Sequence, residues 1–220
     1  MSLPVTYSLY MLTTTFPGTN HVALSSSAPA DANTTWGWNM GQLTPPRFCQ
    51  MDQGVEVPRT SLQWTTTPSG SVPNNTIGDC MVAGPYSGIF NNGRWEITMS
   101  VRAVTQVQGQ DGGFIYRLWK SSTPTGVGAT LITSSYESSS VVTNLTTTVT
   151  PLYATVTYPT FIMRNEYILL QTWWSIIGAS TNNTSDADFS VGATRGCIRT
   201  SYFNTYKKTN VNLIQDDLPI

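Results

Sequence analysis

The fold is decided by the stretch Gly93-Arg94-Trp95-Glu96-Ile97-Thr98-Met99-Ser100-Val101-Arg102, in which apolar and polar side chains alternate. Trp95 and every second residue after it are apolar, and the residues between them are polar or charged. A period of two residues is typical of a β-strand with one face toward a core and the other toward solvent. The pattern predicts a strand over residues 93–107 and places Trp95 in the core.

A turn and a second strand follow this stretch. Gln110-Asp111-Gly112-Gly113 contains the residue types that favour tight turns. The next seven residues, Phe114-Ile115-Tyr116-Arg117-Leu118-Trp119-Lys120, are rich in aromatic and branched side chains. Two strand-like segments joined by a short glycine-rich turn predict a β-hairpin.

Strand patterns continue along the rest of the chain, and helical periodicity is hard to find. The longest apolar stretch, residues 161–177, predicts a central strand buried on both faces. Further strands are predicted over residues 5–14, 55–66, 129–134, 141–150, 152–158 and 189–203, the last broken or bulged at Gly192 and Gly196.

These segments predict an all-β protein, and their spacing favours an antiparallel β-sandwich that is jelly-roll-like, with an extended, loop-rich N-terminal region. We assign residues 1–90 to an N-terminal arm with loops and edge strands. Residues 91–203 are assigned to the sandwich core, and residues 204–220 to a C-terminal tail. No linker is sharp enough to separate two domains, so the three parts are expected to form one structural unit.

Charged residues make up only 10% of the 220 residues, against roughly 25% in ordinary globular proteins. Threonine and serine together supply about a quarter of the chain. Threonine suits a pleated surface, and its hydroxyl keeps that surface hydrated without charge. Such a surface can be covered by another protein without the cost of dehydrating ions. The composition therefore predicts a β-protein whose outside is partly covered by other protein.

Charge and cysteine content narrow the possible environments. The net charge is −1, and the eleven Lys and Arg residues are scattered, so we expect no nucleic-acid partner. No run of about 18 apolar residues occurs, and we expect no contact with a membrane. The N-terminal sequence lacks the pattern of a signal peptide, which predicts synthesis in a cytoplasm. The three cysteines are interpreted as small buried side chains in a reducing compartment.

Catalytic patterns are weak in this sequence. His21 is the only histidine, and it has no acidic or cysteine neighbour at a useful spacing for a nucleophile–base relay. Glu96 and Glu166 could supply the two carboxylates of a glycoside hydrolase, although solvated acids on strand faces are the simpler interpretation. We predict that the chain is not an enzyme and that it binds no cofactor or metal.

Aromatic and proline residues near the N-terminus are the predicted partner-binding residues. Trp36 and Trp38 flank a glycine and could form a glycan platform or an anchor between subunits, and the anchor is favoured. Pro45 and Pro46 force the chain that leads to Phe48 into an extended conformation. We interpret this segment as an arm that lies on a neighbouring subunit.

Three stretches carry a resemblance to a known class of proteins. They are Phe90–Val104, with its glycine and tryptophan, Tyr116–Leu131, with its arginine and small-residue loop, and Asn165–Gln171. Their order resembles virion structural proteins of tailed double-stranded-DNA bacteriophages. That resemblance implies a jelly-roll or related β-sandwich. It includes capsid decoration (cement) proteins, head–tail accessory proteins and fibre domains.

The resemblance and the composition together predict a non-enzymatic structural protein of the virion. The favoured hypothesis is a capsid decoration protein, a homotrimer that contacts itself and the major capsid protein and is made in the host cytoplasm. The alternative is a tail or fibre-associated carbohydrate-binding module that recognises glycans on the host surface. A third and weaker hypothesis is a glycan hydrolase on the same fold.

Overall fold

A computed structural model describes residues 5–19, 21–27, 48–50, 55–57, 77–103, 111–132, 137–140, 150–177, 187–190 and 196–205. These residues form strands and connecting turns without a helix, so the all-β prediction is confirmed. The strands are β1 (Val5–Thr15), β2 (Val22–Ser25), β3 (Phe48–Gln50), β4 (Val55–Val57), β5 (Ile77–Phe90), β6 (Gly93–Ala103), β7 (Asp111–Ser121), β8 (Thr130–Leu131), β9 (Glu137–Ser138), β10 (Thr150–Tyr158), β11 (Phe161–Ile177), β12 (Ala187–Ser190) and β13 (Gly196–Thr205).

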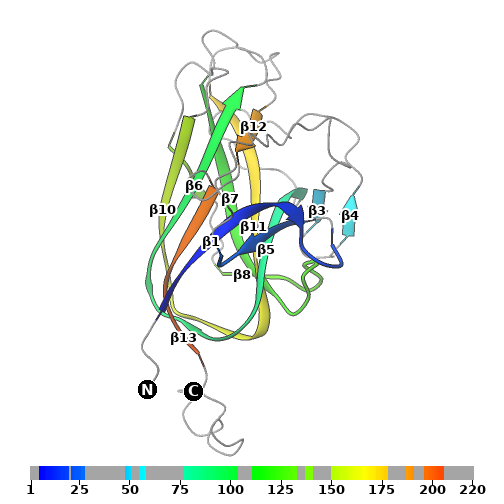
Figure 1. Cartoon of the computed structure of the whole chain (residues 1–220), viewed down its shortest axis with the longest axis vertical. Helices are drawn as coiled ribbons and strands as arrows, with labels where there is room; N and C mark the ends of the chain where they lie inside the picture. The colour runs from blue at the N-terminus through cyan, green and yellow to red at the C-terminus, as the bar shows by residue number, and fades with distance from the viewer. Residues whose placement is uncertain are drawn as a thin grey trace, which may run out of the picture.

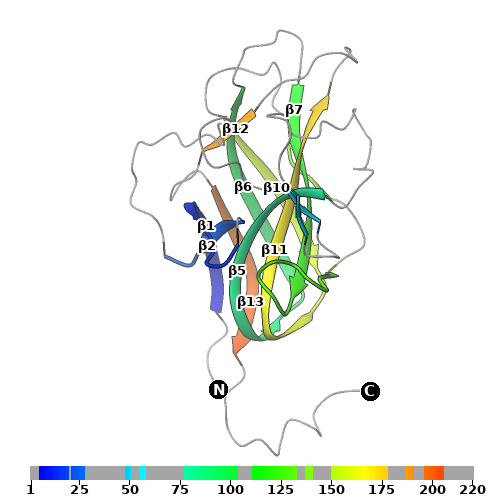
Figure 2. The same ribbon diagram turned by 90° about the vertical axis from the view of Figure 1, so that its right-hand side faces the viewer.

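Hydrogen bonds join the long strands in the order β10-β6-β13-β1-β2-β5-β11-β7-β8. All of these pairings are antiparallel except that of β2 with β5, which is parallel. The short strands sit beside this path, β12 on β6, β9 on β7, and β3 between β4 and β5. In Figure 1, β10 and β6 lie to the left of β5 and β11, and Figure 2 shows the same strands after a quarter turn.

The strand order closes on itself near its middle. β13 pairs with β5 as well as with β1, through Phe203↔Phe90 and the two pairs that follow it. Since β1 pairs with β2 and β2 with β5, four strands form a hydrogen-bonded ring, β13-β1-β2-β5, which is a small barrel. This ring joins the group β10-β6 to the group β11-β7.

One apolar cluster fills the space between the two groups of strands. Trp95, on β6, is fully buried, and its indole Nε1 donates a hydrogen bond of 3.0 Å to Ser201 Oγ. The prediction that Trp95 lies in the core is confirmed. The other members come from both groups and include Leu9, Met81, Phe90, Ile97, Phe114, Leu118, Val156, Ile168, Leu170 and Ile198.

Two predicted strands match the structure closely. The stretch predicted as a central strand is β11, which lies between β5 and β7 and buries Ile168, Leu169 and Leu170 completely. β11 therefore needs apolar side chains on both of its faces, which explains its lack of alternation. β10 shows the strict alternation of a strand with one covered face, and it ends before Pro159 as predicted.

The predicted hairpin is wrong. Both of its strands exist, as β6 and β7, but β6 pairs with β10, β12 and β13, whereas β7 pairs with β8, β9 and β11. Alternation determines which face of a strand is buried and not which strand lies beside it. Of the residues predicted as the turn, Asp111, Gly112 and Gly113 instead begin β7, where they pair with the last residues of β11.

β5 is a long strand that the sequence patterns did not predict. It pairs with β11 along most of its length, with β13 at one end, and with β2 and β3 elsewhere. Gly84 and Pro85 interrupt its middle, and Gly88 follows, so that the apolar residues show neither strict alternation nor a continuous run. β1, β2 and β5, all within the first 90 residues, belong to the same sheet as the later strands.

Other predicted strands are shorter in the structure or fall outside it. Of residues 55–66 the structure describes only β4, and of residues 129–134 it shows only β8 as a strand. The long C-terminal strand is divided into β12 and β13. Of the strand predicted over residues 141–150, the structure describes only Thr150, which begins β10, and the other residues lie outside the described part of the chain. Within the described ranges, no helix is long and apolar enough to span a membrane.

Candidate functional site

Most of the predicted partner-binding residues lie outside the part of the chain that the structure describes. This holds for Trp36, Trp38, Pro45 and Pro46. Phe48 begins β3, where its backbone pairs with Val57 of β4, and its side chain is not described. Their role as contact residues therefore stays a prediction.

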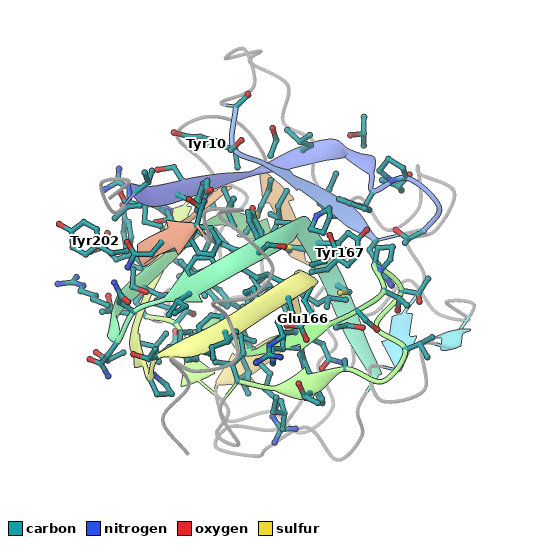
Figure 3. The ribbon with its side chains drawn as sticks, turned by 90° about the horizontal axis from the view of Figure 1, so that it is seen from below. Tyr10, Glu166, Tyr167 and Tyr202 are labelled. Atoms are coloured by element: carbon teal, nitrogen blue, oxygen red, sulfur yellow. The ribbon has the colours of Figure 1, made fainter. Side chains whose placement is uncertain are left out.

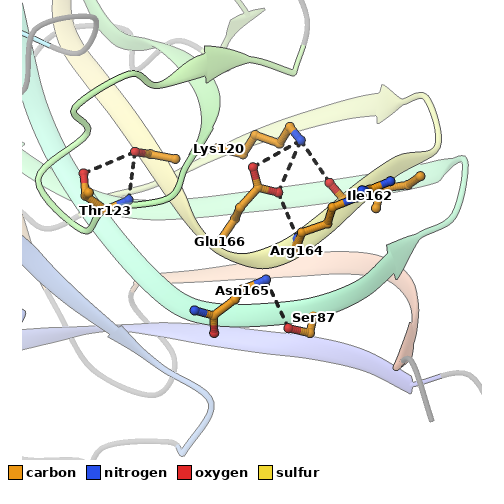
Figure 4. A network of polar contacts seen from close by, with 8 residues as sticks. Ser87, Lys120, Thr123, Ile162, Arg164, Asn165 and Glu166 are labelled. Carbon is orange, nitrogen blue, oxygen red and sulfur yellow. Dashed lines mark hydrogen bonds and ion pairs between the residues drawn. The ribbon is translucent and has the colours of Figure 1, made fainter. Parts of the chain in front are cut away.

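A polar network lies where β7 ends beside β11, and Lys120 and Glu166 are at its centre (Figure 4). Lys120 Nζ lies 3.3 Å from Glu166 Oε2 and 3.4 Å from Oε1, and it donates to the carbonyl oxygen of Ile162 at 3.1 Å. Glu166 Oε2 also accepts a 3.0 Å hydrogen bond from the backbone N–H of Arg164. Both charged side chains are mostly buried, with relative exposures of 28% and 19%.

The network exists because β11 bulges at this point. Its pairing with β5 shifts register on both sides of Glu166, and Asn165 adopts a positive φ of 57°. Asn165 N–H donates to Ser87 Oγ of β5 at 3.1 Å. On the same strand Gly84 has a φ of 128°, and a β-carbon there would lie 3.1 Å from the carbonyl oxygen of Glu166. The close approach therefore requires glycine, and the bulge turns Glu166 toward Lys120.

The first testable prediction concerns this ion pair. Glu166→Gln should lower the free energy of unfolding by about 1–2 kcal/mol, because Lys120 then keeps a mostly buried charge without its counter-charge. The matched control is Glu96→Gln, since the partners of Glu96 are 65% and 72% exposed, and its cost should stay below about 0.5 kcal/mol. Urea unfolding of both variants measures the difference. Equal effects would show that Lys120 and Glu166 behave as a surface pair.

A loop beyond β7 packs hydroxyl groups against the turn between β1 and β2. Ser121 Oγ donates to the carbonyl oxygen of Val127 at 2.8 Å, and the hydroxyls of Thr123 and Thr125 lie 3.1 Å apart. His21 Nε2 lies 3.4 Å from the backbone carbonyl oxygen of Thr125. His21 is 1% exposed. The single imidazole of the chain is thus buried against this loop.

The outward face of β6 and its neighbours carries a second polar group. Glu96 Oε1 lies 2.9 Å from Arg94, and Oε2 lies 3.8 Å from Arg199 of β13. Tyr153 and Tyr202 expose more than half of their surface. Figure 3 shows Tyr202 pointing outward at the side of the molecule, whereas Glu166 lies among the strands.

The structure does not bring Glu96 and Glu166 together. The neighbours of Glu96 on β6, Trp95 and Ile97, belong to the core, so the Glu96 carboxylate points away from it. Glu166 instead meets Lys120, on a different pair of strands. Each carboxylate is neutralised by its own basic partner, and no two-carboxylate glycosidase site is formed by them. Among the residues described, no group of three or more His, Cys, Asp and Glu could hold a metal ion.

A cluster of aromatic rings closes one end of the core beside the four-strand ring. Tyr86 of β5 lies 5.3 Å from Tyr7 of β1 and 5.8 Å from Phe203 of β13, measured between ring centroids. Burial raises the pKa of the Tyr86 phenol far above its usual value, and the nearby Tyr7 adds to the shift. The rings hold three strands of the barrel together.

This shift gives a prediction about pH. The folded protein resists ionisation of Tyr86, whereas the unfolded chain ionises it near its usual pKa of roughly 10. The contribution of the neutral Tyr86 phenol to the free energy of unfolding is therefore fully present below about pH 10, and it is lost as the pH rises beyond that value. Urea midpoints measured from about pH 8 to about pH 11 should fall less steeply for Tyr86→Phe than for the unchanged protein. An identical slope would mean that Tyr86 ionises freely in the folded state.

Comparisons with known proteins give matches by structure alone. No protein-family model matches the chain, and no curated protein matches its sequence. A CocE/NonD family hydrolase from Staphylococcus aureus superposes with a TM-score of 0.50 at 7% identity, over 90% of this chain and 37% of that chain. An aminopeptidase from a marine sediment Thaumarchaeota archaeon gives a TM-score of 0.45 at 10% identity over 91% and 37%. An α-amino acid ester hydrolase gives 0.44 at 13% identity over 90% and 36%.

The match to the CocE/NonD family hydrolase overturns the functional predictions made from the sequence. The similar structures are hydrolases, and none of the three is a virion protein. The resemblance to phage virion proteins, and with it the capsid decoration protein and its glycan-binding alternative, is wrong. The prediction that the chain is not an enzyme is likewise contradicted. The chain spans little more than a third of the hydrolases it resembles.

Proposed function

We propose that this chain is the β-sheet part of a hydrolase and acts beside a catalytic part, located in the same polypeptide or in a bound partner. The observation that carries the proposal is the match to the CocE/NonD family hydrolase, which covers 90% of this chain but only 37% of that enzyme. A fold that forms one part of a larger enzyme is expected to work against the remaining part. Within this proposal, the two groups of strands form an antiparallel, jelly-roll-like β-sandwich joined through the barrel.

The chemistry of the described residues supports this division of labour. Hydrolysis by a nucleophile–base pair needs an accessible base, and the one histidine of the chain is enclosed by the loop that contains Thr125. The Glu166 carboxylate is already engaged by Lys120 and a backbone N–H. In the proposed enzyme, the reacting groups come from the catalytic part, and this chain supplies a rigid wall that positions that part.

The composition fits the same proposal. A surface with 10% charged residues and abundant threonine and serine can be covered by another protein with little dehydration of ions. The catalytic part of a hydrolase is as well suited to cover this surface as a capsid is. In this proposal Trp36, Trp38 and the segment from Pro45 to Phe48 are contacts to the catalytic part.

The experiment is an assay of the protein as it occurs in its source. A tagged copy at its natural length is isolated with its bound partners and tested on a panel of chromogenic esters and amides. We expect hydrolysis of at least one substrate class well above that of an unrelated tagged protein isolated in parallel. Absence of turnover across the panel, with the chain intact and folded, would contradict the proposal.

A further inference from the structure

One edge of the sheet is left open along β10. β10 pairs with β6 in an unbroken register, from Thr150↔Val101 to Tyr158↔Gly93. On its other side, among the residues that the structure describes, only Ser140 forms backbone hydrogen bonds with it. The edge therefore has a covered end, at Tyr153, and an open end beyond it.

The contact with Ser140 shows which way the backbone groups of β10 point. Ser140 N–H donates to the carbonyl oxygen of Tyr153 at 2.7 Å, and Tyr153 N–H donates to Ser140 Oγ at 2.9 Å. Both backbone groups of Tyr153 thus point away from β6. Because this direction alternates in an antiparallel strand, those of Thr155 and Thr157 point away as well. In the described part of the chain they meet no hydrogen-bond partner.

This open end lacks the features that usually protect an edge strand. Natural edges are guarded by charged residues, prolines or bulges. The segment Leu152-Tyr153-Ala154-Thr155-Val156-Thr157-Tyr158 has none of them. Its inward side chains, Ala154 and Val156, are buried, and its outward side chains, Thr155 and Thr157, are exposed. The result is an uncharged strand of high β-propensity, whose two outward donors and two outward acceptors meet no backbone partner among the described residues.

We propose that the open edge of β10 pairs with β10 of a second copy of this chain. The two strands run antiparallel about a twofold axis opposite Val156, so that Thr155 of each copy pairs with Thr157 of the other. Four backbone hydrogen bonds form across the axis, because both residues present their N–H and C=O groups outward. The threonine side chains meet as Thr–Thr pairs, which stabilise neighbouring strands. The sheet then continues from one copy into the other.

The observations favour a second copy over an unrelated strand. A twofold interface must be complementary to itself. The edge of β10 meets this condition, since its outward backbone N–H and C=O groups are equal in number and residues 152–158 carry no charge. The net charge of −1 per chain opposes association little. A single strand edge buries less than a standard interface of about 1,600 Å². The dimer is therefore weak, with a dissociation constant of roughly 10 µM to 1 mM. The pairing does not depend on the proposed hydrolase function.

Sedimentation of the protein over about 10 µM to 1 mM tests the pairing. The mass should rise from one copy toward two across this range. Thr157→Pro removes the outward N–H without removing a bond to β6, and Thr155→Lys places like charges across the axis. Both variants should shift the dissociation constant at least tenfold. The control Thr6→Lys adds the same charge to exposed residue 6 on β1, away from the edge, and should dimerise normally.

Hydrogen exchange gives a second readout that does not depend on a variant. The amides of Thr155 and Thr157 should become protected as the concentration rises, whereas other exposed amides should not. Melting of the variants at low concentration confirms that they fold. A protein that stays monomeric at about 1 mM, or a dimer that both variants leave unchanged, would overturn the proposal. The proposal would also be overturned if the amides of Thr155 and Thr157 were protected from exchange only when a strand from another protein was bound.

Discussion

Trp95→Ala should lower the free energy of unfolding by about 3–5 kcal/mol, the usual cost of removing a large buried aromatic side chain. Trp95 is fully buried. Its ring lies 5.2 Å from Phe90 of β5, 5.6 Å from Tyr158 of β10 and 5.9 Å from Phe161 of β11, measured between centroids. The indole therefore touches strands of both groups, and alanine leaves a cavity between them. Urea unfolding measures the loss.

The control for this variant is Ser201→Ala, which removes the acceptor of the indole N–H and the hydroxyl that donates to the carbonyl oxygen of Asn91, but leaves the indole ring in place. One buried donor left without a partner costs about 1–3 kcal/mol, so the effect should be smaller than that of Trp95→Ala. A loss below about 1 kcal/mol for Trp95→Ala would show that the two groups of strands do not share a core at this residue.

Gly88→Ala should also be strongly destabilising, by about 3 kcal/mol or more. Gly88 pairs with Met163 of β11 and with Thr205 of β13, at the point where the barrel closes. A β-carbon there would collide with the carbonyl oxygen of Asn204 and the ring of Phe203. The carbonyl oxygen belongs to the backbone, so the collision is relieved only if β5 and β13 separate.

Gly196→Ala is the matched control, because it is also a buried glycine on a strand. Its β-carbon would meet Met11, with the sulfur at 2.8 Å as the nearest atom. A flexible thioether can move aside, and the expected loss is about 1 kcal/mol. Thermal unfolding of both variants compares them. Equal losses would contradict the tight pairing of β5 with β13 and the barrel built on it.

The individual strands could be predicted because single-sided burial leaves a strict pattern. β10 alternates between buried and exposed residues, and β6 alternates between buried and more accessible residues from Arg94 to Met99, and both strands were predicted. β11 was predicted from the opposite pattern, since a strand covered on both faces has no polar side. β5 was not predicted, because Gly84 and Gly88 are required for close approaches and, together with Pro85, they break both patterns.

The pairing of the strands could not be predicted in the same way. β6 and β7 follow each other in sequence, which favours a hairpin, yet they belong to different groups of strands. The partners of β6 are β10, β12 and β13, and its pairs with β10 run from Thr150↔Val101 to Tyr158↔Gly93, which are far apart in the sequence. Its pairing depends on which buried faces fit together in the core, and that information is distributed over many residues.

The polar network was missed for a related reason. Lys120 and Glu166 are separated by 46 positions, and only the register of β7 with β11 brings them together. Asn165, a residue type that tolerates positive φ, was the one local signal of the bulge. His21 was noticed, but its enclosure depends on the loop containing Thr125, which is 104 positions away.

The functional error has a physical explanation as well. Low charge and abundant threonine describe a surface that other protein can cover, and they do not identify the covering protein. The capsid hypothesis added an identity that the composition did not contain. We propose in its place the catalytic part of a hydrolase, because the chain matches only 37% of the CocE/NonD family hydrolase that it resembles in fold.

Co-fractionation tests the central claim most directly. An extract of the source is separated by size, and each fraction is measured for this chain, with an antibody, and for hydrolysis of the substrates found in the assay panel. The account predicts one peak of hydrolysis that follows the chain and disappears when the antibody depletes it. Full activity after complete depletion, in every fraction that contained the chain, would contradict the claim that the chain is part of a hydrolase.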